Sequence, residues 1–312
     1  MSSHALSSET AVSDVVRHAL GARASVRFHG WHVRRENYVV VSVETQRPRM
    51  RLIVKLEQPG ERPNRHFDAM AAIARLVRSQ TSVPTFEVVA VDVSRQTWPW
   101  TYLIVTEVRG ATWHELYPRL DTASRLIAQR QIGTAAAQLH ALRFDAFGHI
   151  GADGAVVEGA TVLPALERRV RQRLTTPRFL RCMLEVLNRR AHLFDDVATP
   201  TLCHEDLNSN NLVFEVRNGR PELTGILDFE SAWASTGESD LARLELWRLS
   251  AGAAVREGYA EVAPVAATYG ARRPLLQLLW CLEFAQDHRS ADHQLLTDSV
   301  CDELAVARIQ FG

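Results

Sequence analysis

Two short apolar runs on either side of an Asn-Gly pair stand out in the hydrophobic pattern of the chain. The runs span residues 212–214 and 223–227, and Asn218 and Gly219 lie between them. Asn-Gly favours a tight turn because both residues tolerate positive φ angles, so the pattern predicts a β-hairpin. A hairpin is rigid, and it would hold the polar residues at its two ends close to one another.

The first 110 residues read as two helices and several strands. Residues 8–20 and 64–77 carry apolar side chains at the spacing of amphipathic helices. The strand-like runs are 26–44, 51–56, 84–93 and 101–110. We expect the first run to form two strands around a turn at His29-Gly30-Trp31, where a glycine interrupts the apolar pattern.

Beyond residue 109 the pattern changes from strands to helices. Helical periodicity predicts a helix that begins near Ser239, one or two helices over 163–191, and others over 122–142, 275–285 and 295–311. We therefore expect an N-terminal lobe, residues 1–108, and a C-terminal lobe, residues 109–312. The fold class is α+β, with a small antiparallel sheet in the first lobe and a larger, mainly helical second lobe.

Composition and charge argue against several classes of partner. The 312 residues carry 36 basic and 36 acidic side chains, so no net charge directs the chain to nucleic acid or to a membrane surface. No apolar run reaches the roughly 18 residues of a membrane span, and no signal peptide is evident. Single, unpaired cysteines indicate reduced thiols in a cytoplasmic protein, namely Cys182, Cys203, Cys281 and Cys301. No obligatory protein partner is evident.

Only one of the 36 basic residues is a lysine, Lys55, and it lies in the strand-like run 51–56. Its ammonium group is a compact point charge, whereas the guanidinium group of arginine is planar, so the two are not interchangeable at a phosphate. A lone lysine in such a strand indicates a contact to nucleotide phosphates. The alternative is that its position is a coincidence.

The residues that flank the predicted hairpin have the spacing of a phosphoryl-transfer site. His204-x-Asp206-x-x-x-x-Asn211 precedes it, and Asp228 follows it within Asp-Phe-Glu. In such a site a carboxylate orients the attacking hydroxyl and accepts its proton, which is the role open to Asp206. Mg²⁺ prefers oxygen ligands, which Asn211 and Asp228 offer. The spacing alone arises by chance in many chains, but together with the hairpin and the second acid it favours a kinase site.

With these motifs in this order, the chain resembles the aminoglycoside phosphotransferase family, which are small-molecule kinases of the bilobal protein-kinase-like fold. The resemblance covers about residues 26–270 and includes the segments 138–150 and 237–244. The first segment contains Leu-His and then Phe-Gly, and the second contains Gly-acid-x-Asp-Leu-Ala. We interpret His140, in the first segment, as a buried and hydrogen-bonded histidine.

By position, the resemblance implies that Asp206 is the catalytic base and that Asn211 and Asp228 bind Mg²⁺. It also implies that Lys55 contacts the phosphates of the nucleotide, which is ATP or, as the open alternative, GTP.

The resemblance implies further roles around the nucleotide and the loop. The backbone of Glu107 and Val108 would form the adenine-binding hinge. Asp68, on the second predicted helix, stands where the family template has a glutamate that pairs with the strand lysine. His204 and Asp240 would support the catalytic loop structurally.

The sequence also departs from the family pattern. Glu205 stands where glycine is usual, and residues 208–210, Asn-Ser-Asn, replace a run like His-Pro-Gly. The region expected to cover the phosphates has a single glycine. None of these changes removes a catalytic group, so we expect an active enzyme.

The predicted function is transfer of the γ-phosphoryl group of ATP to a hydroxyl of a small molecule. Only eleven residues separate Asp228 from Asp240, too few for the long segment on which a protein kinase binds its peptide. The expected acceptor is an aminoglycoside-like or other amine-bearing antibiotic, whose phosphorylation would confer resistance. The alternatives are a small metabolite, such as choline, a sugar or an amino alcohol, and a non-catalytic nucleotide-binding module.

A cationic acceptor would need local acidic residues. Four carboxylates near the hairpin or on later helices are candidates for contacts to it, with solvated surface charge as the alternative for each: Glu230, Glu238, Glu283 and Asp287.

Overall fold

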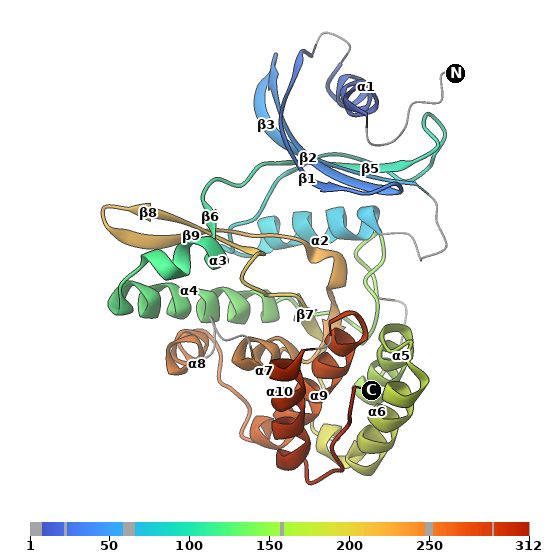
Figure 1. Ribbon diagram of the computed structural model, residues 1–312, viewed down its shortest axis with the longest axis vertical. Helices are drawn as coiled ribbons and strands as arrows, with labels where there is room; N and C mark the ends of the chain where they lie inside the picture. The colour runs from blue at the N-terminus through green and yellow to red at the C-terminus, as the bar shows by residue number, and fades with distance from the viewer. Residues whose placement is uncertain are drawn as a thin grey trace. The chain divides into compact units, whose positions relative to one another are not determined.

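The computed structural model describes residues 8–21, 24–58, 66–156, 159–246, 252–288 and 290–311 (Figure 1). The chain divides into two compact units, and each of them is built from three separate segments of the sequence. The first comprises Met1–Gly110, Gly151–Gly154 and Thr224–Glu230. The second comprises Ala111–Ile150, Ala155–Leu223 and Ser231–Gly312.

A five-stranded antiparallel sheet forms the centre of the first unit, in the order β1-β2-β3-β5-β4. Its strands are β1 (Val26–Arg34), β2 (Tyr38–Gln46), β3 (Arg49–Glu57), β4 (Val88–Asp92) and β5 (Thr101–Thr106). In β3, alternate residues point to opposite faces, so Leu52, Val54 and Leu56 are buried on one side and Lys55 lies on the other. Lys55 pairs across the sheet with Val40 and Leu103.

The prediction of a turn at His29-Gly30-Trp31 is wrong. β1 runs through these residues as one strand, and irregularities in its pairing with β2 fall at Phe28/Gly30 and Trp31/Val33. A bulge absorbs the extra residue without reversing the chain, and glycine is common at such a site. The chain reverses at 35–37 instead, where the Arg35 N–H donates to the Tyr38 carbonyl at 2.9 Å.

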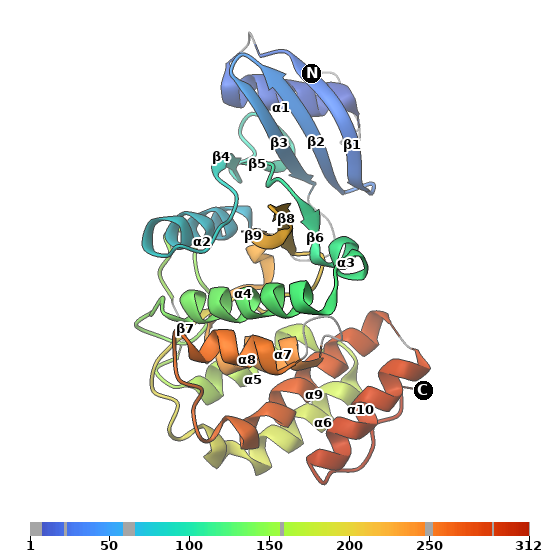
Figure 2. The same cartoon turned by 90° about the vertical axis from the view of Figure 1, so that its left-hand side faces the viewer.

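Two helices complete the first unit, and both were predicted. α1 (Glu9–Leu20) begins at Ser8, whose hydroxyl accepts a hydrogen bond from the Ala11 N–H. The valines of α1 pack against the buried side chains of β2 and β3, so that α1 covers one face of the sheet (Figure 2). α2 (Phe67–Gln80) ends three residues later than predicted; the first two residues of the predicted helix, 64–65, lie outside the described residues.

The second unit is mainly helical. Its helices are α3 (Trp113–Leu116), α4 (Thr122–His140), α5 (Val162–Arg173), α6 (Pro177–Arg189), α7 (Glu238–Leu246), α8 (Ala253–Ala260), α9 (Tyr269–Asp287) and α10 (Ala291–Glu303). Of the one or two helices predicted over 163–191, the structure has two, α5 and α6, and the predicted helix over 295–311 already ends at Glu303.

α4 and α8 pack at very short range in the second unit (Figure 1). A Cβ atom on Gly133 would lie 1.9 Å from the Val255 carbonyl oxygen, and one on Gly258 would lie 2.0 Å from the Arg130 carbonyl oxygen. Only glycine permits this approach, so the two glycines fix α8 against the helix that ends at His140.

The predicted hairpin is confirmed. It consists of β8 (Leu212–Arg217) and β9 (Arg220–Ile226), with β6 (Ala111–Thr112) on the other side of β8. Asn218 and Gly219 both have positive φ, 51° and 76°, as the tight turn requires. Before the hairpin, β7 (Thr201–Cys203) pairs with β10 (Trp233–Ser235).

The expectations from composition concerned the cysteines and the apolar runs of the chain. All four cysteines are unpaired thiols. Within the described residues, no helix has the length and apolarity needed to cross a membrane.

Candidate active site

The loop between β7 and β8 holds the side chain of Asp206 at both of its carboxylate oxygens. Asn208 Nδ2 donates to Oδ1 at 2.7 Å, and Asn211 Nδ2 donates to Oδ2 at 2.9 Å. The Asn210 N–H donates to Asn208 Oδ1 at 2.8 Å. Because an N–H can only donate, this bond fixes which end of the Asn208 amide faces the carboxylate. Asp206 is therefore oriented by two carboxamides.

The same contacts turn the oxygen of Asn211 away from Asp206. Asn211 Nδ2 also donates to the main-chain carbonyl of Asp206 at 2.9 Å, so the nitrogen end of the amide faces this residue. The oxygen end is the one that can bind a cation.

Asp240, at the start of α7, supports the loop from below. Its carboxylate is fully buried and accepts hydrogen bonds from the N–H groups of His204 and Glu205, both at 2.7 Å. The Asp206 N–H donates to His204 Nδ1 at 3.2 Å, so this ring nitrogen is an acceptor. Three consecutive N–H groups of the loop are thus bound by side chains.

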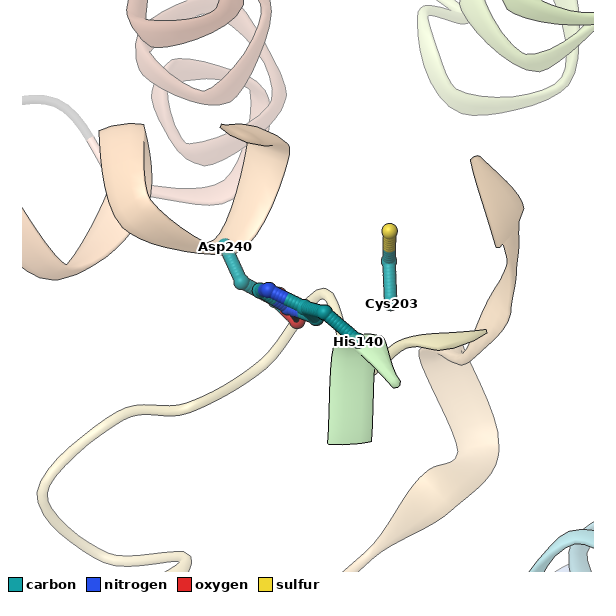
Figure 3. A group of neighbouring side chains, drawn as sticks. All are labelled: His140, Cys203 and Asp240. Carbon is teal, nitrogen blue, oxygen red and sulfur yellow. Dashed lines mark hydrogen bonds and ion pairs between the residues drawn. The ribbon is translucent and has the colours of Figure 1, made fainter. Parts of the chain in front are cut away.

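His140, Cys203 and Asp240 form a buried cluster under the loop, with ligand atoms within 4.8 Å of one another (Figure 3). Each of these groups has a protein partner. His140 lies between Asp240 Oδ2, at 3.1 Å from Nε2, and the Tyr259 hydroxyl, at 2.9 Å from Nδ1. Cys203 Sγ donates to the Thr236 carbonyl at 3.1 Å, and burial raises the pKa of its thiol. We interpret the cluster as a hydrogen-bond network, and the prediction of a buried, hydrogen-bonded His140 is confirmed.

Glu205, which directly precedes Asp206 in the loop, has an unusual backbone conformation. Its φ is 64°, and its side chain is 1% exposed. The carboxylate pairs with Arg243 at 2.8 Å and with Arg169 at 3.3 Å. Burial would raise the pKa of Glu205, but Arg243 and Arg169 outweigh this effect and hold that pKa well below its usual range. Burial and the nearby Arg173 lower the pKa of Arg169 to about 10, which leaves its guanidinium charged at neutral pH.

In the first unit, Lys55 and Asp228 form an ion pair. Lys55 Nζ donates to Asp228 Oδ1 at 3.0 Å and lies 3.9 Å from Met70 Sδ on α2. Asp68 precedes Met70 by two residues, about 200° around the helix, and its Oδ1 accepts the Ala69 N–H at 2.9 Å. The structure therefore does not bring Asp68 to Lys55, and Asp228 is the acid that Lys55 contacts.

Asp228 belongs to a short segment that the first unit binds firmly. Its φ is 61°, a conformation that aspartate tolerates better than most residues. The Ile226 N–H donates to the Pro84 carbonyl at 2.8 Å, and the Thr85 hydroxyl donates to the Ile226 carbonyl at 2.7 Å. The Phe229 ring packs on Phe86 with 6.0 Å between the ring centroids. These contacts fix the position of Asp228 relative to the sheet that carries Lys55.

Glu107 and Val108 directly follow β5. The Glu107 N–H donates to the Arg51 carbonyl at 2.9 Å, and its side chain pairs with Arg51 at 3.3 Å. The side chains of Arg51, Glu107 and Arg109 line part of a pocket of about 560 Å³. An adenine edge would therefore use the carbonyl of Glu107 and the backbone groups of Val108.

Two of the four carboxylates expected at an acceptor are held in ion pairs. Both oxygens of Glu238 accept from the buried Arg272, at 2.5 and 2.7 Å. Glu283 pairs with Arg243 at 3.0 Å and with Arg173 at 3.5 Å. The other two, Glu230 and Asp287, are exposed.

The sequence did not single out Asn208, Arg169 or Arg243, although all three contact the loop. Asn208 was visible only as a departure from the family pattern. The sequence did contain a signal for the two arginines. Glu205 stands in the usual place of a glycine next to Asp206, and a buried acid needs a counter-charge. Their separation from Glu205 by 36 and 38 positions hid which arginines supply it.

Fold and loop together define a class, the phosphotransferases of the protein-kinase-like fold. The model of the phosphotransferase enzyme family, APH, matches residues 29–275, and the chain belongs to this family. The predicted membership and the predicted α+β fold are thus confirmed.

Three solved structures illustrate the similarity in fold. Aminoglycoside phosphotransferase APH(4)-Ia has a TM-score of 0.65 at 17% identity, over 95% of this chain and 98% of the other. A thermostable mutant of that enzyme, in a ternary complex with AMP-PNP and hygromycin B, has a TM-score of 0.63 at 17% identity over 95% and 94%. A microcompartment-associated aminopropanol kinase has a TM-score of 0.57 at 15% identity over 95% and 95%.

Proposed function

We propose that the protein transfers the γ-phosphoryl group of ATP to a hydroxyl group of a small molecule. The observation that carries the proposal is the state of Asp206, whose two oxygens are held by Asn208 and Asn211. A carboxylate oriented in this way can in turn orient an attacking hydroxyl and accept its proton. Membership of the family supports the same reaction.

Two residues of the predicted site suit Mg²⁺ as the metal ion. Asn211 offers an amide oxygen that is turned away from Asp206, and Asp228 offers a carboxylate, which is the all-oxygen donor set that Mg²⁺ prefers. We propose that these two residues bind the ion. A bound Mg²⁺ would offset the negative charge of the phosphates.

Lys55 is proposed to contact the phosphates of the nucleotide, and Glu107 and Val108 to bind the adenine through their backbone. The complex of the APH(4)-Ia mutant with AMP-PNP supports ATP as the nucleotide. Lys55 is held by Asp228 in the structure, and phosphate would replace this carboxylate as the partner of the ammonium group.

For the acceptor, we propose an amine-bearing compound with a free hydroxyl. The complex of the APH(4)-Ia mutant with hygromycin B supports an antibiotic. A second candidate is a small amino alcohol, which the similarity to an aminopropanol kinase supports. The ion pairs of Glu238 and Glu283 favour this second candidate, because a polycation would have to displace Arg272 or Arg243 to reach those carboxylates.

ADP release with Mg-ATP tests the proposal on two panels, one of aminoglycosides and one of small amino alcohols. We expect turnover that needs Mg²⁺ and that Asp206→Ala lowers at least ~10³-fold, the order expected when a positioned base is lost. Glu185→Gln, an exposed change on α6, is the matched control and should keep full activity. Equal turnover by the parent and Asp206→Ala would contradict the proposal. Nucleotide binding without turnover on either panel would favour a non-catalytic module.

A further inference from the structure

Glu205 combines two features that are costly for a glutamate. Its backbone is in the left-handed region, with φ at 64°, which glycine adopts more easily than any other residue. Its carboxylate is also removed from water, at 1% exposure. Buried acids persist only where paired charges and hydrogen bonds offset the loss of hydration. The surroundings of Glu205 must therefore hold both the side chain and the backbone.

Arg243 of α7 binds both parts of Glu205. Its Nη2 pairs with the carboxylate at 2.8 Å, and its Nη1 donates to the main-chain carbonyl of the same residue at 2.5 Å. Glu283 accepts from the same nitrogen, Nη2, at 3.0 Å and so also holds the guanidinium group in place. A single arginine thus ties the carboxylate of Glu205 to the peptide bond that leads into Asp206.

Arg169 of α5 completes the arrangement. It pairs with the Glu205 carboxylate, donates to the Ser231 carbonyl at 2.9 Å, and stacks on the Trp233 ring at 4.4 Å. Trp233 lies on β10, next to the strand that enters the loop. Two helices and a strand therefore meet at this one carboxylate. We call Glu205, Arg243 and Arg169 the Glu205 clamp.

The clamp acts on the peptide unit between Glu205 and Asp206. The carbonyl of this unit accepts from Arg243, and its N–H donates to His204 Nδ1. With both polar groups bound, the plane of the peptide is fixed, and so is the direction in which the Asp206 side chain leaves the backbone. We propose that Glu205 is a positioning residue for Asp206, acting through Arg243 and Arg169; the inference rests on the proposed function of Asp206.

Two substitutions separate the side chain of Glu205 from its backbone. Glu205→Gly keeps the left-handed turn easily and removes the carboxylate, whereas Glu205→Gln keeps the shape and removes the charge. If only the turn mattered, glycine would be the better residue. If the clamp positions Asp206, both variants lose rate.

Steady-state kinetics well below the unfolding temperature is the first test. We expect both variants to lower kcat roughly ten- to hundredfold, the order expected from a small misplacement of a catalytic group, with KM for ATP within about twofold of the parent. Val300→Ala, a buried change on α10, is the control for lost stability and should keep the parental kcat. A parental kcat in Glu205→Gly would overturn the proposal.

Amide hydrogen exchange tests the clamp independently of turnover. The N–H groups of His204, Glu205 and Asp206 are bound by side chains in the structure, and we expect them to exchange at least about tenfold faster in Glu205→Gly than in Val300→Ala. Unchanged exchange at these positions would overturn the clamp even if no acceptor were found. A parent that turns over no acceptor but shows the expected exchange would refute the proposed function alone.

Discussion

Two ion pairs of the candidate site, Lys55–Asp228 and Glu205–Arg243, differ mainly in how exposed their side chains are. Lys55 and Asp228 pair at 3.0 Å with side chains 12% and 34% exposed. Glu205 and Arg243 pair at 2.8 Å with side chains 1% and 7% exposed. The first pair joins residues that a nucleotide and its metal ion would contact directly. The second joins a loop to the helices that support it.

The difference shows how one protein uses the same interaction for two purposes. A partly exposed pair gains little stability, since water and salt screen it, and so its partners can exchange for ligands at low cost. A buried pair cannot be broken singly without leaving an unpaired charge. We therefore interpret Lys55–Asp228 as a resting contact of binding groups and Glu205–Arg243 as a permanent support.

The stability of two isosteric variants tests this comparison most strongly. Glu205→Gln is expected to lower the free energy of unfolding by about 3–5 kcal/mol, because Arg243 and Arg169 would lose their buried counter-charge. Asp228→Asn, which also keeps the shape of its residue, is expected to cost no more than about 1 kcal/mol. Urea unfolding of both proteins measures the two values. Equal losses would remove the distinction between the pairs.

Lys55→Arg tests whether the partly exposed pair, Lys55–Asp228, consists of binding groups. The variant keeps the charge but replaces a compact ammonium group by a planar fork, and we expect kcat/KM for ATP to fall roughly ten- to hundredfold. Arg181→Lys, an exposed change on α6, is the control and should leave kcat/KM unchanged. If Lys55→Arg matched the parent, the lone lysine of the chain would have no special role.

A substitution of Asn208 tests a single hydrogen bond of the loop, the one to Asp206 Oδ1. Asn208→Ala removes the donor to Asp206 Oδ1, and a hydrogen bond to a charged group contributes about 1.5–3 kcal/mol, so kcat is expected to fall about tenfold or more. Asn210→Ala keeps the main-chain N–H that orients Asn208 and should be nearly silent in the same assay. A larger loss in Asn210→Ala than in Asn208→Ala would contradict the assignment.

The pH dependence of stability tests the buried pair in a second way. Burial raises the pKa of Glu205, but the charges of Arg243 and Arg169 lower it by more. The pKa therefore falls from 4.5 to about 2 on folding. Its contribution is then complete above about pH 4.5 and is lost as the pH falls toward 2, because the unfolded chain takes up the proton first. The difference in unfolding free energy between the parent and Glu205→Gln should shrink over this range. A constant difference down to pH 3 would contradict the pairing.

The sequence predicted those parts of the fold that local chemistry determines. Asn218 and Gly219 adopt positive φ at little cost, as a two-residue turn between strands requires, and the hairpin follows from them. Gly30 carries a weaker signal, because glycine serves a bulge as well as a turn, and β1 continues through it. The register with β2 decides between the two, and no local pattern contains that information.

The candidate site was predictable in its residue types but not in its partners. The order of Asp206, Asn211 and Asp228 around a hairpin was enough to indicate phosphoryl transfer. Glu238 was predicted as a candidate contact to the acceptor, yet it binds Arg272, which lies 34 positions away on another helix. Such pairings depend on tertiary packing.

The central claim is that Asp206 is the base of a phosphoryl transfer to a small molecule. Mass spectrometry of a library of hydroxylated amines incubated with the protein and Mg-ATP tests it most directly. We predict that at least one compound gains a single phosphoryl group with the parent and with Glu185→Gln, and that Asp206→Ala leaves the same compound unmodified. The same product from Asp206→Ala at the parental rate would contradict the claim.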